Sequence, residues 1–134
     1  MELPAFTSFM TLIAVGQFFA FSFLVGRARV KHNVPAPATY GNPEFERTFR
    51  VQQNTMEQLV FFLPSLWMFG LWVNDLAAGV LAIFWVIGRE LYAMSYIKDP
   101  EGRGKGFMIS MAAGAILWAG ALGAIAYEEV SSFF

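Results

Sequence analysis

The chain has 134 residues, of which 57% are hydrophobic and 14% are charged, and its net charge is −1. Soluble domains carry about 25% charged residues, so this composition indicates an integral membrane protein in contact with the lipid bilayer. The length allows a single domain over residues 1–134. The absence of cysteine excludes disulfides and a protein thiolate, and with one histidine we expect no metal site and no catalytic triad.

The first predicted helix covers residues 3–26. This run holds 24 residues without a charge, enough to cross a hydrocarbon core of about 30 Å. The basic residues Arg27, Arg29 and Lys31 follow the run, whereas a cleavable signal peptide would carry its basic residues before it. We therefore expect a retained helix, followed by a loop rich in proline and glycine.

The second predicted helix covers residues 43–73, with Asn42 as its N-cap and Pro43 as its first residue. About 30 residues at 1.5 Å each give roughly 45 Å, which exceeds the thickness of the hydrocarbon core. Its first turns should therefore project into the headgroups. Pro64 should kink this helix within the membrane.

Two more helices are predicted over residues 76–97 and 106–128, separated by a glycine-rich polar loop. The expected fold is an all-α integral membrane bundle of four transmembrane helices. Every lysine and arginine falls on the side of the two long loops, whereas the opposite side carries only acidic residues. The positive-inside rule then places both long loops in the cytosol and both termini on the opposite side.

Polar residues in the first half of the second predicted helix share one face. Four of them fall within about 80° at 100° per residue: Arg47, Arg50, Asn54 and Glu57. Arg50 and Glu57 lie about 10 Å apart along the axis, so we expect no direct pair between them within the helix. Each should find its partner in another helix, another subunit or a ligand. The alternative is a structural role in which Arg50 pairs with Glu46.

The third predicted helix repeats this arrangement with Arg89, Tyr92 and Tyr96. Taken alone, these residues also fit an interfacial tyrosine belt with a snorkelling arginine. Each of these two groups forms a polar stripe along one face of its helix. Two polar stripes at the same depth predict instead a polar pocket, rich in cations and hydrogen-bond donors, that opens to the cytosol.

Other polar features carry weaker signals. The loop sequence EGRGKG, residues 101–106, lacks the spacing of a phosphate-binding loop and is not interpreted as one. His32 is expected to be solvated in a basic loop. The basic residues that follow the first helix also have the composition of a contact with anionic lipid headgroups.

Two segments carry a family resemblance: EFERTFRVQQNTMEQLVFFLPSLW, residues 44–67, and GRELYAMSY, residues 88–96. They resemble the membrane-associated proteins in eicosanoid and glutathione metabolism, the MAPEG family. The likeness is strongest to the branch that holds leukotriene C synthase and microsomal glutathione transferases two and three. It implies a homotrimer of four-helix subunits, with glutathione as co-substrate bound between neighbouring subunits.

The resemblance also implies the roles of individual residues. Arg103 would lie beside the glutathione thiol and promote its ionisation. The positions that would hold the tripeptide are Arg29, Arg50, Gln52, Asn54, Glu57, Gln58, Arg89, Tyr92 and Tyr96. Gln58 and Val30 depart from the leukotriene synthase pattern, which has a tyrosine and a second arginine at these places.

The implied activity is that of a membrane glutathione transferase acting on hydrophobic electrophiles, with glutathione-dependent peroxidase activity as a further expectation. The alternative is a non-catalytic lipid-binding scaffold that resembles the five-lipoxygenase-activating protein. That protein departs from the family at the positions of Arg50 and Glu57, and this chain keeps both. No nucleic-acid partner is expected. Short loops and the absence of a retention signal in residues 130–134 favour a bacterial inner membrane.

Overall fold

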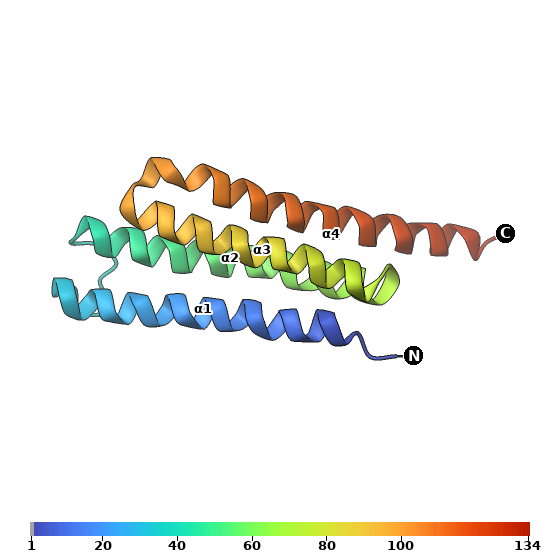
Figure 1. Cartoon of the computed structure of the whole chain (residues 1–134), viewed down its shortest axis with the longest axis horizontal. Helices are drawn as coiled ribbons and strands as arrows, with labels where there is room; N and C mark the ends of the chain where they lie inside the picture. Colours follow the sequence, from blue (N-terminus) through green and yellow to red (C-terminus); the bar gives the residue numbers. More distant parts are fainter. Residues whose placement is uncertain (1) are drawn as a thin grey trace.

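Four long helices make up the structure, a computed structural model that describes residues 2–134. They are α1 (Ala5–His32), α2 (Pro43–Trp72), α3 (Asp75–Lys98) and α4 (Gly104–Ser131), and a short 3₁₀ helix, η1 (Pro100–Arg103), precedes α4. All four run along a common axis, with both termini at one end and the α1–α2 and α3–α4 connections at the other (Figure 1). We call these the terminal end and the loop end of the bundle.

Among residues 2–134, three helical segments are long and apolar enough to cross a membrane: α1, α3, and α4 together with η1. The α2 helix is not among them, because the polar residues 44–58 occupy its first half. It nevertheless has 30 residues, continues through Pro64, and packs against the other three long helices. The polar half of α2 therefore contacts protein along much of its length, which lowers the cost of polar groups at membrane depth.

The predicted ends of the helices are wrong mainly for α1 and α4. The apolar run predicts an end at residue 26, but α1 continues to His32 and stops at Asn33 in a left-handed conformation (φ 54°). A helix requires only its backbone hydrogen bonds, and arginine and lysine are good helix formers outside the hydrocarbon. The α4 helix likewise extends beyond residues 106–128 at both ends. The predicted ends of α2 and α3 agree within one residue.

The side chains at the start of α2 show one correct prediction and one wrong one. Asn42 caps the helix as predicted, since its Oδ1 accepts a hydrogen bond from the N–H of Phe45 (3.1 Å). His32, predicted to be solvated in a loop, is instead the last residue of α1. Its side chain is only 15% exposed, and its Nε2 lies 3.6 Å from the carboxylate of Glu44. His32 therefore lies against the start of α2 rather than in solvent.

Aromatic packing joins the helices in the middle of the bundle. Phe62 of α2 stacks on Trp85 of α3 with ring centroids 4.1 Å apart, and both side chains are fully buried. A second cluster lies nearer the loop end and consists of Phe21, Val51, Tyr92 and Ala93. This second cluster packs α1, α2 and α3 together beside the polar residues of α2 and α3.

Two glycines bring α3 and α4 into backbone contact at the loop end. A Cβ atom on Gly106 would contact the backbone N of Tyr92 and lie 2.7 Å from its Cα. A Cβ atom on Gly88 would lie 2.7 Å from the backbone N of Ser110. No side chain fits in either place. This contact fixes the start of α4, and with it Arg103, against the Tyr92 side of α3.

Asp75 joins α1 to α3 at the terminal end. Its carboxylate accepts hydrogen bonds from the N–H groups of Phe6 (3.0 Å) and Thr7 (2.8 Å) and from the Thr7 hydroxyl (2.7 Å). The first N–H groups of a helix have no partner within the helix, and Pro4 offers no side-chain cap. A residue from another helix therefore supplies the cap of α1, a contact that the sequence did not predict.

We expect Asp75→Ala to lower the thermal unfolding temperature of the detergent-solubilised protein by a few degrees, because it removes three hydrogen bonds at once. The matched control is Glu129→Ala, which removes an exposed carboxylate at the same end and should leave the unfolding temperature unchanged. Equal unfolding temperatures for wild type and Asp75→Ala would contradict the capping role.

Candidate functional site

A polar cavity of about 390 Å³ opens at the loop end, between α2, α3 and the start of α4. Its volume lies within the range of small-molecule sites in proteins. Five predicted site residues line it, together with two that the prediction missed: Arg50, Asn54, Tyr92, Tyr96, Arg103, Gly104 and Phe107. Two residues of each polar stripe, Arg50 and Asn54 of α2 and Tyr92 and Tyr96 of α3, therefore line a common space, and the start of α4 closes it.

The stripe of α2 contains an ion pair that was predicted to be absent. Arg50 Nη1 lies 3.4 Å from Glu57 Oε1, although the two residues are seven positions apart. Both side chains are long and extend toward each other along the helix, so the separation of the backbones does not keep the charges apart. Asn54 lies between them and donates from Nδ2 to Glu57 Oε2 (3.5 Å). The alternative pair of Arg50 with Glu46 is not formed within residues 2–134.

Arg89 lies behind the cavity rather than in its wall. Its side chain is fully buried, and its Nη2 donates to Asn54 Oδ1 (2.9 Å) and to Thr55 Oγ1 (2.8 Å). Its guanidinium also lies over the ring of Tyr92, 4.2 Å from the centroid. Nε and Nη1 have no hydrogen-bond partner in the part of the chain that the structure describes. From its buried position behind the cavity, Arg89 thus orients two residues of the cavity wall, Asn54 and Tyr92.

An aromatic wall faces the α2 stripe. The rings of Tyr92 and Tyr96 are stacked, with centroids 5.4 Å apart and an angle of 7° between the planes. Phe107 packs against Tyr92, and the guanidinium of Arg103 lies 5.8 Å from the centroid of Tyr96. Arg103 also donates from Nη1 to the carbonyl of Pro100 (3.1 Å). The stacked tyrosines and η1 together hold an exposed cation at the mouth of the cavity.

Three predicted site residues lie away from this cavity. Arg29 donates from Nη1 to the carbonyls of Val34 (3.2 Å) and Ala38 (2.6 Å), so it holds the α1–α2 connection. Gln52 donates to Ser22 Oγ of α1 (3.2 Å). Gln58 contacts Met111 Sδ of α4 (3.0 Å). Within one chain, some of the predicted site residues therefore line the cavity, whereas others make contacts elsewhere on α1, α2 and α4.

The residues that the prediction missed carried only a weak signal in the sequence. Phe107 is one of many phenylalanines, and Gly104 is one of several glycines in its loop. Neither can be assigned to a site before the approach of α4 to α3 is known. Within residues 2–134 there is no group of three His, Cys, Asp or Glu side chains that could hold a metal ion.

The cavity offers a defined set of chemical groups to a ligand. It presents two guanidinium groups, Arg50 and Arg103, the amide of Asn54 and two phenols, and the carboxylate of Glu57 lies beside Arg50. Arginines bind carboxylates through paired hydrogen bonds, and a carboxylate binds an ammonium group. The arrangement suits a small polar molecule that carries more than one carboxylate and one ammonium group.

Several known proteins are similar to this chain in sequence over most of its length. Residues 7–123 match the sequence model of the MAPEG family. An uncharacterized protein of Synechocystis is 42% identical over 126 residues, which cover 92% of each chain. Human microsomal glutathione S-transferase 2 is 42% identical over 104 residues, 77% of this chain and 71% of the relative. Rat leukotriene C4 synthase is 35% identical over 102 residues, 76% and 68% of the two chains. The predicted family is confirmed: the chain is a multi-pass membrane protein and belongs to the MAPEG family.

Proposed function

We propose that this protein is a membrane glutathione transferase that joins the glutathione thiolate to hydrophobic electrophiles and also reduces lipid hydroperoxides. The relatives named above include a glutathione S-transferase and a leukotriene C4 synthase. The observation that carries the proposal is the cavity itself, in which two cations, an amide and two phenols from three helices converge. Glutathione has two carboxylates, one ammonium group and a thiol, and the cavity groups together with the carboxylate of Glu57 beside Arg50 complement them.

Each group of the cavity has a role in this proposal. Arg50 binds a carboxylate of glutathione, Glu57 binds its ammonium group, and Asn54 holds the peptide backbone between them. Tyr92 and Tyr96 form the opposite wall and donate hydrogen bonds. Arg103 stands at the mouth and stabilises the thiolate, which then attacks an electrophile that arrives from the bilayer.

Two of the three predicted residues that lie away from the cavity fit a shared site. Arg29 of α1 and Gln52 of α2, which donates to Ser22 of α1, do not line the cavity of their own chain. We propose that they reach the cavity of a neighbouring subunit in a homotrimer, where Gln58 also lies close to the bound tripeptide. In this arrangement all four long helices span a bacterial inner membrane, with the loop end in the cytosol, where the basic residues gather.

The proposal is tested by isothermal titration of the purified protein in detergent with glutathione, followed by a conjugation assay with chlorodinitrobenzene. We expect saturable binding and turnover that requires glutathione. An absence of both binding and turnover would overturn the proposal. Binding without turnover of any electrophile or hydroperoxide tested would leave a binding protein and refute the transferase. Chemical cross-linking of the same sample should give trimers, and a monomer would refute the shared site.

Arg89→Met should weaken glutathione binding about tenfold, because Asn54 loses the donor that orients its amide. The unfolding temperature should not fall, since the variant replaces an incompletely paired buried charge with an apolar side chain of similar length. Titration and thermal unfolding of one preparation measure both effects. A lower unfolding temperature with unchanged binding would assign Arg89 a purely structural role.

A further inference from the structure

A carboxylate of α3 lies on the side of that helix that faces away from the polar cavity. Glu90 is exposed and lies about 160° around α3 from Tyr92, which lines the cavity. Its Oε2 accepts a hydrogen bond from Nε2 of Gln17 of α1 (3.0 Å), and the same nitrogen donates to the carbonyl of Val86 (2.9 Å). Glu90 and Gln17 therefore meet at the contact between α1 and α3.

Both residues lie deep in the membrane-spanning part of their helices. Gln17 precedes Arg27, the first basic residue after the apolar run, by ten positions, or about 15 Å at 1.5 Å per residue. Glu90 precedes Lys98, at the end of α3, by eight positions, or about 12 Å. Because a hydrocarbon core is about 30 Å thick, both side chains lie well below the headgroups. An ionised carboxylate is costly at this depth unless a positive group offsets its charge.

A groove of about 570 Å³ between α1 and α3 includes this pair. Apart from Gln17 and Glu90, its lining consists of aliphatic and aromatic side chains, among them Ile13, Leu24 and Val86. We call it the α1–α3 groove. Its volume lies within the range of small-molecule sites in proteins. The groove thus combines one negative charge with apolar walls.

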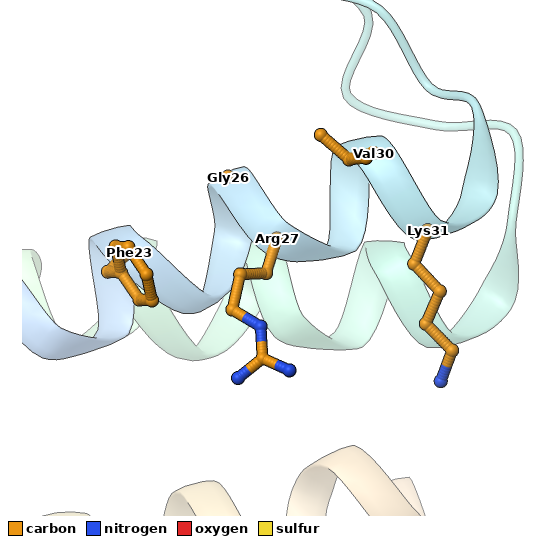
Figure 2. A pocket seen from close by; sticks show the side chains of 5 residues that line it. All are labelled: Phe23, Gly26, Arg27, Val30 and Lys31. Atoms are coloured by element: carbon orange, nitrogen blue, oxygen red, sulfur yellow. The ribbon is translucent and has the colours of Figure 1, made fainter.

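The carboxylate in the groove has no cationic partner among residues 2–134. Glu90 forms no ion pair there and accepts a side-chain hydrogen bond from Gln17, which is uncharged. Figure 2 shows Arg27 and Lys31 closer to the α1–α2 connection than Phe23, a residue of the groove. Lys31 pairs with Glu44 instead (3.3 Å). The amide of Gln17 therefore orients the carboxylate without neutralising it.

The α1–α3 groove lies on another side of α1 than the residues assigned above to a neighbouring subunit. Around α1, Gln17 lies about 120° from Arg29 and about 140° from Ser22, the hydrogen-bond partner of Gln52. The groove and the polar cavity have no lining residue in common. A ligand of the groove therefore requires neither the proposed trimer nor the proposed transferase activity.

We propose that the α1–α3 groove binds a lipophilic amine, with its ammonium group at Glu90 and its apolar part against Ile13 and Leu24. The ammonium group supplies the positive charge that the carboxylate lacks, and its N–H groups donate charge-assisted hydrogen bonds. A hydrated metal ion would leave the apolar walls without a partner. The amine of a phospholipid headgroup stays at the membrane surface, about 12 Å or more from Glu90. The ligand is therefore an amine that itself partitions into the bilayer.

The test compares two fluorescent ligands that differ in charge. Dansylcadaverine carries one primary ammonium group on an apolar body, and its N-acetyl derivative is uncharged. Each is titrated into the full-length protein in an uncharged detergent, and the fluorescence of the detergent alone is subtracted. A hydrogen bond to a charged group strengthens binding about tenfold or more, so the wild type should prefer the charged ligand by at least that factor. We expect Glu90→Gln to abolish this preference.

The matched control is Glu129→Gln, which removes an exposed carboxylate at the terminal end and should keep the full preference. Ala20→Leu narrows the groove without changing a charge and should weaken binding of both ligands. The unfolding temperature should not fall, because Ala20 is exposed. Glutathione should not displace dansylcadaverine, since the polar cavity is separate. Equal affinity of the wild type for the two ligands, a preference that survives in Glu90→Gln, unchanged binding by Ala20→Leu, or displacement by glutathione would each overturn the proposal.

Discussion

Arg103→Ala should reduce conjugation about eightfold at pH 7 under the proposed function. A free thiol has a pKa near 8.5, and a nearby guanidinium lowers the pKa by about one unit because it stabilises the thiolate. At pH 7 this change raises the ionised fraction from about 3% to about 24%. Arg103 is held at the mouth of the cavity by Pro100 and Tyr96, so its charge is available to a bound thiol. Removing it should raise the pKa of the thiol again.

The pH profile separates this role from a loss of binding. Above about pH 9.5 the thiol is ionised with or without the guanidinium, so the deficit of Arg103→Ala should disappear there. Thiolate absorbance of the glutathione complex near 240 nm, followed against pH, gives the pKa directly. Lys105→Ala is the control for removing a cation near the start of α4 and should leave the profile unchanged. A deficit that stays constant across the pH range would contradict thiolate stabilisation.

Gly106→Ala should prevent the native packing of α3 against α4. The added Cβ would contact the backbone of Tyr92 and of Gly88, and backbone atoms cannot move aside as the end of a flexible side chain can. We expect a destabilisation of about 3 kcal/mol or more, the upper part of the range for overpacking. The polar cavity should be lost at the same time, because Arg103 and Phe107 reach it through this contact.

Thermal unfolding and glutathione titration of the same samples measure both consequences. Gly123→Ala is the control, since a Cβ atom there would meet nothing within 4 Å. That variant should be as stable as the wild type or more stable by about 0.5–1 kcal/mol, because alanine favours a helix over glycine. A Gly106→Ala protein with the stability and binding of the wild type would show that the two helices can separate at this point without consequence.

Much of the candidate site could be predicted from periodicity within single helices. Arg50 and Asn54 of α2, and Tyr92 and Tyr96 of α3, lie on the predicted stripes and line one cavity. The stripes could not show that Arg89 is fully buried behind Asn54, because its exposure depends on the residues that a second helix places over it. A calculation from backbone rise also missed the Arg50–Glu57 pair, since it ignored the reach of the side chains.

The sequence by itself determined the membrane class of the chain, the existence of four helices, the N-cap at Asn42 and the family, because apolar length, capping and motif spacing are local properties. Only the tertiary structure decided which polar residues of different helices contact one another. The close contact of Gly106 with α3 determines the position of Arg103. Asp75, at the start of α3, caps α1. The orientation of α1 assigns Arg29 to the loop and leaves Arg27 and Lys31 on the outside. Each of these depends on distances between helices, which no pattern within one helix contains.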